Sequence, residues 1–208
     1  RINDTYVGIN NTQLNNAVGM YQRRKNRYWL SLSSDTSLSN NFILIYDSFL
    51  NAWGKYTGFS STCMSIFMVN GTEERPYFAD NWGYVYRGDY GLNDTPLNTT
   101  TAINAYYATN WKYYDDLCDR KGLPHVYITH RNESNTVLTL NYNYDFYNGD
   151  QYTQSFSCQA TQSVTALTTR RDLIGRGRFV MLKFSNNATN TTFRIDGLGT
   201  YLTQESKS

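Results

Sequence analysis

Residues 27–58 read RYWLSLSSDTSLSNNFILIYDSFLNAWGKYTG, three aromatic or β-branched runs separated by Ser, Asn and Asp. Short runs of this kind, bounded by turn-forming residues, are typical of β-strands. Ser, Asn and Asp favour turns because their short side chains hydrogen-bond the nearby backbone. We therefore expect three consecutive antiparallel strands, at 27–32, 41–47 and 52–58.

A second set of strands follows at 63–69, 76–80 and 83–87. The Asn70-Gly71 pair predicts a tight hairpin between the first two, because a type I′ turn needs positive φ at both central residues. Two sets of short strands at this spacing are typical of adjacent blades of a β-propeller. Two blades cannot close a ring, so the other blades are expected upstream of Arg1 or in another chain.

The segment 88–101 is rich in Gly, Pro, Asn and Thr, which favours a domain boundary. We expect propeller blades over 1–92, a linker over 93–101 and a β-sandwich over 102–208. The predicted fold class is all-β, a partial β-propeller of about two blades followed by the sandwich. A helical turn is expected only at 114–121. The strands expected in the sandwich are 102–109, 125–129, 136–144, 152–158, 177–184 and 192–198.

Composition excludes several classes of protein. The chain has 208 residues, 19 Lys and Arg against 17 Asp and Glu, a formal charge of +2 and 16% aromatic residues. A disordered chain has few aromatics, and a duplex-DNA-binding domain usually has a large basic excess. The longest apolar run, 42–46, is too short for a helix that crosses a bilayer, so no membrane-spanning segment is expected.

The start of the chain and its cysteines give expectations about the cell compartment in which the protein folds. Arg1 is followed by no charged, apolar and small-residue leader, so we expect no signal peptide and interpret the chain as a fragment, a processed product or the ordered part of a longer protein. The chain has an odd number of cysteines, and they are far apart in the sequence: Cys63, Cys118 and Cys158. We expect buried or unreactive thiols in a reducing compartment, with neither a metal site nor a disulfide framework.

Catalytic groups are scarce in this sequence. Propellers also house glycosidases, which place two carboxylates across a sugar. Asp47 and Asp80 each follow a strand, where Asp commonly caps its own turn. The two histidines, His125 and His130, are expected to be partly exposed strand residues. We predict no catalytic residue, metal ligand or cofactor; the glycosidase candidates considered are Asp47, Asp80, Asp89, Glu73 and Glu74.

Two groups of residues are candidates for contacts with partners. Basic residues precede the first of the three strands and flank a later turn; they either contact DNA phosphates or a neighbouring subunit, or lie in solvated loops. Tyrosines around 142–152 fit a core, a subunit interface or a glycan groove. The basic residues are Arg23, Arg24, Lys25, Arg27, Arg176 and Arg178, and the aromatic residues are Tyr142, Tyr144, Tyr147 and Tyr152.

The order of these motifs resembles the C-terminal part of propeller-bearing tail proteins of short-tailed bacteriophages: the nozzle, tail-tube or packaged-DNA-stabilising components. The resemblance covers most of the chain and lies in the order of weak motifs: propeller end, Asn/Thr linker, aromatic strand to Trp111, sandwich. The matching segments are 28–30, 41–47, 52–53, 56–58, 76–80, 83–86, 101–106, 109–111, 177–179, 184–186 and 193–199.

The resemblance implies a virion structural protein of the tail that folds in the host cytoplasm. Such a protein would form a homo-oligomeric ring below the portal, contact portal, adaptor or tail proteins, and touch genomic DNA transiently and without sequence specificity. It would help retain the packaged genome and pass it during ejection. The alternative is a carbohydrate-binding or glycan-degrading tail module that recognises the host surface.

Overall fold

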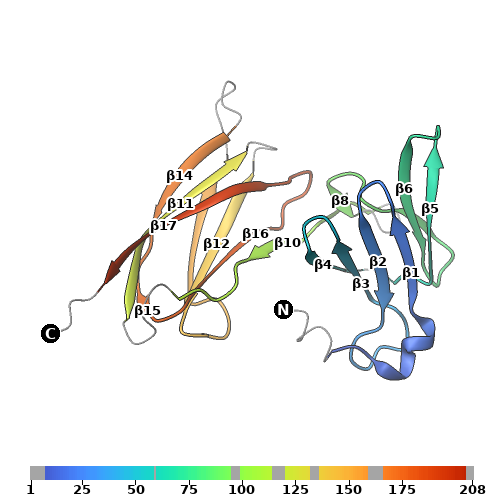
Figure 1. Cartoon of the computed structure of the whole chain (residues 1–208), viewed down its shortest axis with the longest axis horizontal. Helices are drawn as coiled ribbons and strands as arrows, with labels where there is room; N and C mark the ends of the chain where they lie inside the picture. Colours follow the sequence, from blue (N-terminus) through green and yellow to red (C-terminus); the bar gives the residue numbers. More distant parts are fainter. Residues whose placement is uncertain are drawn as a thin grey trace. The chain divides into compact units, whose positions relative to one another are not determined.

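The computed structural model describes residues 8–58, 60–94, 99–113, 120–131, 136–158 and 166–204. Almost every regular element in these ranges is a β-strand, which confirms the all-β prediction (Figure 1). The chain divides into two compact units, Arg1–Tyr90 and Gly91–Ser208. Each unit is described by itself.

The first unit begins with a short 3-10 helix, η1, over Asn11–Asn16. A four-stranded antiparallel sheet follows, in which each strand pairs with the next along the chain. Short turns between the strands explain this order, because antiparallel neighbours need only tight connections. The strands are β1 (Val18–Gln22), β2 (Arg27–Leu32), β3 (Phe42–Asp47) and β4 (Ala52–Thr57).

Alternation along β3 assigns its side chains to two faces of the sheet, because successive residues of a strand point in opposite directions. Ile43 and Ile45 join a buried cluster with Trp29, which is 0% exposed. Phe42 and Leu44 join a different cluster on the other face. Both faces of β3 are therefore buried, which accounts for its continuous apolar run.

A second sheet packs on the Trp29 side of the first. It contains β5 (Cys63–Val69), β6 (Glu73–Ala79) and β7 (Val85–Arg87), and Met64 and Ile66 of β5 contact the Trp29 cluster. The β5–β6 turn has φ of 52° at Asn70 and 65° at Gly71, as the sequence predicts for this hairpin. The first unit is thus a stack of two sheets, and its assignment to a propeller stays a prediction.

The second unit contains two four-stranded sheets that share one core. Leu140, Leu182 and Phe184 of one sheet and Val126 and Ile128 of the other belong to the same buried cluster. The first sheet has the order β10 (Ala105–Ala108), β16 (Val180–Asn186), β12 (Val137–Tyr144) and β13 (Tyr152–Ser157). In the second, β11 (Lys121–Arg131) pairs with β14 (Ala166–Asp172), β15 (Arg176–Gly177) and β17 (Arg194–Gln204).

The structure differs from the sequence expectations in several places. Within the expected linker, β8 (Asn93–Asp94) pairs with β9 (Thr101–Ala102). The helical turn expected at 114–121 lies mostly outside the described residues, and Lys121 is the first residue of β11. His130, expected to be partly exposed, is 0% exposed, because it points from β11 into the core.

Candidate interaction surfaces

Asp47 and Asp80 close the turns that follow their strands. Asp47 Oδ1 accepts hydrogen bonds from the backbone N–H groups of Phe49 and Leu50, at 3.1 and 3.0 Å. Asp80 Oδ1 accepts from the N–H groups of Trp82 and Tyr84 at 2.9 and 3.0 Å. Both side chains therefore cap turns, as the sequence predicts.

The pKa values of these two carboxyls follow from the same contacts. The Leu50 N–H group holds the pKa of Asp47 below its ordinary value. Burial acts to raise the pKa of Asp80, but hydrogen bonds led by the Tyr84 N–H group and the Tyr86 hydroxyl outweigh it, and the pKa is lowered. Both groups are ionised at neutral pH and lack the raised pKa of a general acid.

Lys25, just before β2, and Arg27, its first residue, bind carboxylates of the same unit. Asp89 Oδ2 lies 3.3 Å from Lys25 Nζ and 3.1 Å from Arg27 Nη1. Arg27 Nε also lies 3.3 Å from Asp47 Oδ2. Much of the positive charge of this cluster is therefore neutralised locally, which weakens its attraction for phosphates.

Arg24 and the two glutamates of β6 also have partners within the unit. The Arg24 N–H group donates to Glu74 Oε2 at 2.8 Å, and its guanidinium donates to the Gly71 carbonyl at 3.2 Å. Glu73 forms ion pairs with Arg75 at 2.7 Å and with Arg87 at 3.1 Å. Arg23 is exposed. All five carboxylates considered as glycosidase candidates thus have partners within the unit.

The two histidines have different surroundings. His125 Nδ1 lies 2.8 Å from Asp172 Oδ1 at the surface of β11. His130 Nε2 lies 2.9 Å from Thr169 Oγ1, and its Nδ1 is buried without a hydrogen-bond partner in the described structure. Burial and the charge of Arg171 lower the pKa of His130, so its ring is neutral at pH 7.

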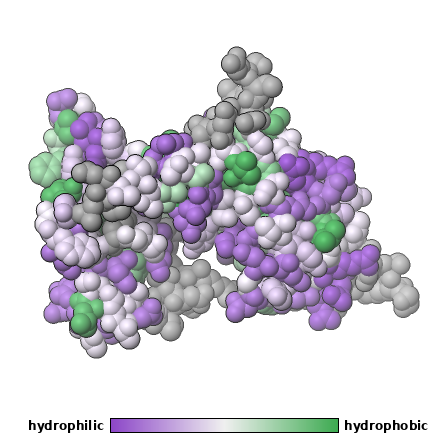
Figure 2. Space-filling model, turned by 180° about the vertical axis from the view of Figure 1, so that it is seen from behind, coloured by the Kyte–Doolittle hydropathy of each residue, from purple (hydrophilic) through white to green (hydrophobic). Residues whose placement is uncertain are grey.

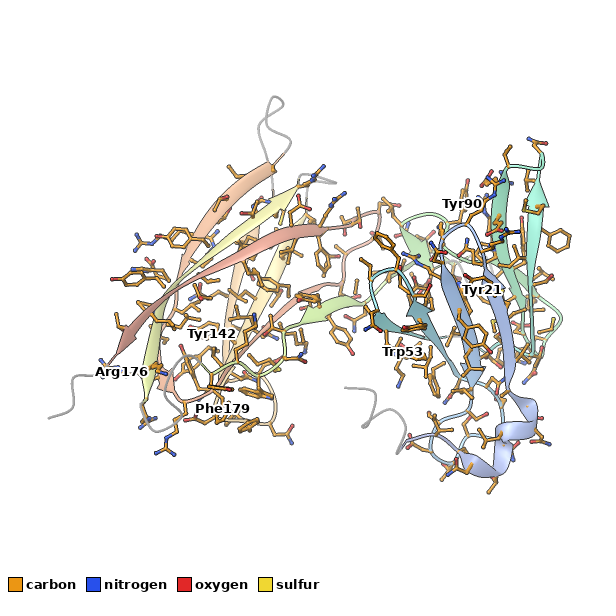
Figure 3. All side chains as sticks on the ribbon, viewed as in Figure 1. Tyr21, Trp53, Tyr90, Tyr142, Arg176 and Phe179 are labelled. Atoms are coloured by element: carbon orange, nitrogen blue, oxygen red, sulfur yellow. The ribbon has the colours of Figure 1, made fainter. Side chains whose placement is uncertain are left out.

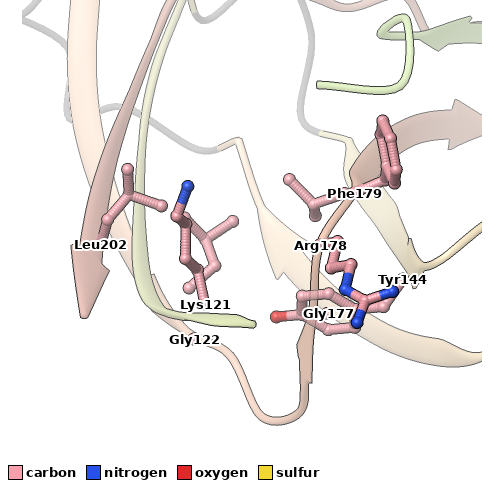
Figure 4. Close-up of a pocket in the computed structure, with 9 residues that line it drawn as sticks. Lys121, Gly122, Tyr144, Gly177, Arg178, Phe179 and Leu202 are labelled. Atoms are coloured by element: carbon pink, nitrogen blue, oxygen red, sulfur yellow. The ribbon is translucent and has the colours of Figure 1, made fainter. Parts of the chain in front are cut away.

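The two cavities described in the second unit are small. One of about 10 Å³ is lined by residues of β11, β15 and β17 of one sheet and of β12 and β16 of the other (Figure 4). This volume is about what one water molecule needs. The other, beside β16 and β17, has about 100 Å³. Both are smaller than the usual sites for small-molecule ligands.

Most of the tyrosines considered as interface residues belong to the core of the second unit. Tyr142, labelled in Figure 3, is 1% exposed, and its ring stacks on Tyr152 at a centroid distance of 5.0 Å. Tyr144 is also buried, and its ring meets Tyr152 edge-on at 6.2 Å. Tyr147 is exposed. The surface offered to a partner by this group is therefore Tyr147 and the accessible part of Tyr152.

A chain of rings lies at the surface of the second unit beside this core. Phe146 contacts Trp111 at 4.8 Å and Phe179 at 4.6 Å between ring centroids. Asp145 Oδ1 accepts the N–H groups of Arg178 and Phe179, at 2.6 and 3.1 Å, which fixes the segment that carries Phe179. Arg176 and Arg178 are exposed beside this segment, and Figure 3 shows Arg176 and Phe179 at this end of the unit.

A row of four aromatic residues crosses the first sheet from edge to edge. Tyr21 of β1 lies opposite Tyr28 of β2, Tyr28 opposite Tyr46 of β3, and Tyr46 opposite Trp53 of β4. Directly opposite residues point to the same face of a sheet. Tyr21 and Trp53, labelled in Figure 3, are 53% and 44% exposed. We call this surface the aromatic face.

The far side of the second sheet of this unit is also exposed. Phe67 of β5 and Val85 of β7 are 59% and 69% exposed, and the Phe67 ring meets Tyr77 edge-on at 5.4 Å. Arg75 lies opposite Phe67, and Arg87 opposite Tyr77. We call this surface the outer face. Alternation places it opposite the side of β5 from which Met64 and Ile66 contact the Trp29 cluster.

Hydrophobic side chains form separate small groups among polar ones on the face of the molecule shown in Figure 2. Tyr and Trp, which dominate the aromatic face, combine an apolar ring with a polar atom and are enriched in interfaces.

Within the described ranges no helix is long and apolar enough to cross a membrane. The same ranges contain no group of three or more His, Cys, Asp or Glu side chains placed to hold a metal ion.

The described residues define an all-β protein whose five candidate carboxylates are engaged in hydrogen bonds and ion pairs. Its first unit exposes two sheet faces that carry aromatic residues. Among known proteins, no family model matches the chain and no curated protein matches it. The aromatic row was missed from the sequence because it depends on register. Tyr21 and Tyr28 lie symmetrically about the 23–26 turn, as Tyr46 and Trp53 do about the 48–51 turn, and this spacing is the signal that could have revealed the row.

Proposed function

We propose that the chain is a structural component of a short-tailed phage tail, part of the nozzle or hub that surrounds the DNA exit channel below the portal. It would act by shape and association, with neighbouring portal, adaptor or tail proteins as partners. The observation that carries this proposal is the stack of two sheets in the first unit, which presents aromatic residues on both of its outward faces. Such faces favour protein contacts.

The electrostatics support a passive role toward DNA. The formal charge is only +2, and Lys25 and Arg27 bind Asp89 within the unit. Each phosphate contact tightens DNA binding and would slow the passage of a polyanion. A wall with few available cations lets DNA slide. Contact with the genome would then be transient and independent of base sequence.

A non-catalytic role also agrees with the state of three of the carboxyls considered as glycosidase candidates. A general acid or base works best with a pKa near the working pH. The pKa values of Asp47, Asp80 and Glu73 lie below their ordinary values; for Glu73 the main cause is its hydrogen bond with Arg75. The cavities described are too small to enclose a sugar.

The test is the location of the chain in the virion. Cryo-electron microscopy of intact particles should show its two units below the portal, and mass spectrometry should find it at a fixed ratio to the portal protein. The purified chain should bind duplex DNA at about 150 mM salt with a Kd no tighter than about 10⁻⁵ M. Absence from the tail, or turnover of a polysaccharide abolished by Asp80→Asn, would overturn the proposal.

One observation favours the second candidate, a carbohydrate-binding module. Exposed Tyr and Trp rings in a row, as on the aromatic face, are a common way to bind sugars. A glycan array probed with the labelled chain tests this function. Binding that is lost in Trp53→Ser and kept in Leu38→Ser, an exposed loop residue, would support it.

A further inference from the structure

We propose that the aromatic face of one copy of this chain binds the outer face of the next copy, head to tail. This inference rests on the proposed function and names the surfaces that would hold the ring together. The two outward faces of the stacked sheets in the first unit differ in composition, and both are exposed. The aromatic face carries Tyr21, Tyr28, Tyr46 and Trp53, and the outer face carries Phe67, Tyr77 and Val85.

The interior of the unit shows how such sheets associate. Trp29, Ile43 and Ile45 of the first sheet pack against Met64 and Ile66 of the second. Sheets stack in this way because each apolar face removes the other from water. A contact between copies would repeat this step, since it places the second sheet of one copy on the first sheet of the next.

The aromatic face is partly covered within its own unit. Ile9 and Ala17 pack against the cluster formed by Leu32, Phe42 and Leu44 at one end of this face. The aromatic row lies at the other end and stays exposed. A partner therefore has a defined place to bind, beside the segment that includes η1.

Charge and polarity favour a second copy over a sugar as the occupant. The strand residues that point to the aromatic face include Lys55 and no Asp, Glu, Asn or Gln, so this part of the face offers few groups to bind sugar hydroxyls. The outer face supplies what this surface lacks. Its Arg75 pairs with Glu73 within the face and can also lie over a Tyr or Trp ring of the partner. Arg87 already lies over Tyr90 at 3.9 Å, and Lys55 lies over Phe42 at 4.6 Å on the aromatic face, where the charge of Glu73 on a second copy would attract it.

The size of the faces predicts the strength of one contact. A four-stranded face with strands of this length measures about 20 Å by 20 Å, or about 400 Å². Standard interfaces bury about 800 Å² on each partner. A single contact is therefore weak, and self-association should be seen only at high protein concentration, unless several contacts close a ring.

The experiment is sedimentation equilibrium of the full chain over a range of concentrations up to several hundred micromolar. The wild-type chain should self-associate. Trp53→Ser on the aromatic face and Phe67→Ser on the outer face should each weaken association at least tenfold, while the control Leu38→Ser leaves it unchanged. Circular dichroism of each variant verifies that it is folded.

Mixing the two variants tests the head-to-tail arrangement. Trp53→Ser keeps an intact outer face, and Phe67→Ser keeps an intact aromatic face. An equimolar mixture should therefore form a dimer through its one intact contact, with wild-type affinity, although each variant alone associates at least tenfold more weakly. If Trp53→Ser abolishes association and Phe67→Ser has no effect, the two aromatic faces pair with each other and the proposal is wrong.

Other outcomes separate this inference from the proposed function. A chain that stays monomeric at every concentration, or whose aromatic face binds a glycan instead, overturns the inference. If that chain is still found in the tail, the proposed function stands. If the faces bind as described but the chain is absent from virions, the proposed function fails and the inference stands.

Discussion

The ring of Tyr28 lies directly against Gly19 on the neighbouring strand. A Cβ atom on Gly19 would lie 2.5 Å from the Tyr28 hydroxyl oxygen and 3.1 Å from Cζ. The missing side chain of Gly19 thus lets this ring lie along the sheet. Glycine within a strand often marks such a close approach.

Gly19→Ala should therefore displace the Tyr28 ring and leave the fold intact. The atom met by the new methyl group is at the free end of an exposed side chain, so the free energy of unfolding should fall by less than about 1 kcal/mol. Self-association should weaken, because the aromatic face changes shape. Gly54→Ala is the control, since its methyl group would meet only the Ile45 carbonyl at 4.0 Å. Equal self-association in both variants would contradict this expectation.

Gly177→Ala should be far more costly than Gly197→Ala in the second unit. A Cβ atom on Gly177 would lie 2.7 Å from the Cβ atom of Tyr144, which is close to the backbone and cannot swing away. We expect a loss of about 1–3 kcal/mol in the free energy of unfolding. At Gly197 the nearest atom is 3.8 Å away. Urea unfolding of the two variants measures the difference, and similar stabilities would show the predicted clash to be absent.

Asp89→Ala should destabilise the first unit. Asp89 accepts the Tyr56 hydroxyl at 3.0 Å and binds Lys25 and Arg27. Its loss leaves the Tyr56 hydroxyl and Lys25 without this acceptor, while Arg27 keeps Asp47, and we expect a cost of about 2 kcal/mol. A double-mutant cycle with Tyr56→Phe isolates the hydroxyl contribution. Additive effects of the two substitutions would mean that this hydrogen bond contributes nothing.

His130 should make the second unit less stable in mild acid. Its pKa is lowered in the folded state, mainly by burial, so below the ordinary value of 6.5 the unfolded chain binds a proton that the folded chain resists. Stability should fall as pH drops below about 6.5. In a His125→Gln background, His130 is the only histidine. Adding His130→Gln should then abolish the fall in stability between pH 7.5 and 5.5, measured as the midpoint of thermal unfolding at each pH. If the midpoint still falls equally with pH, other groups cause the effect.

Cys63 and Cys158 should differ in their reaction with iodoacetamide at pH 8. Cys158 is 1% exposed, and burial raises the pKa of its thiol to about 11, so little reactive thiolate forms. Cys63, expected from the sequence to be buried or unreactive, is exposed at the start of β5 and should react quickly. Peptide mass spectrometry assigns the sites, with labelling in denaturant as the reference. Rapid modification of Cys158 in the folded chain would contradict its burial.

Local sequence patterns predicted much of the fold. The β5 strand at 63–69 was predicted to the residue, because an alternating apolar run ends there at an Asn-Gly turn. β1 and β14 were missed. The residues of β1 include a Gly and a Gln, and those of β14 include two Arg and no aromatic residue, so neither carries a strong strand signal. Both strands form because neighbouring strands supply the pairing.

The candidate surfaces were harder to predict than the strands. The basic run at 23–27 is visible in the sequence, but its partner Asp89 is more than 60 residues away along the chain. Tyr142 and Tyr144 have the same alternation that an interface strand would have, and only the presence of a second sheet over β12 decides that they are buried. Contacts between distant segments of the chain therefore set the role of each residue.

Because the two outward faces of the first unit differ, the number of copies in an assembly decides whether every face is covered. A pair of copies joined head to tail still leaves one aromatic face and one outer face uncovered, and so does any open row of them. Only a closed circle covers every such face. An open row of copies would therefore still bind further copies through its two uncovered faces. A closed ring would bind no more, so growth would stop without a separate capping protein.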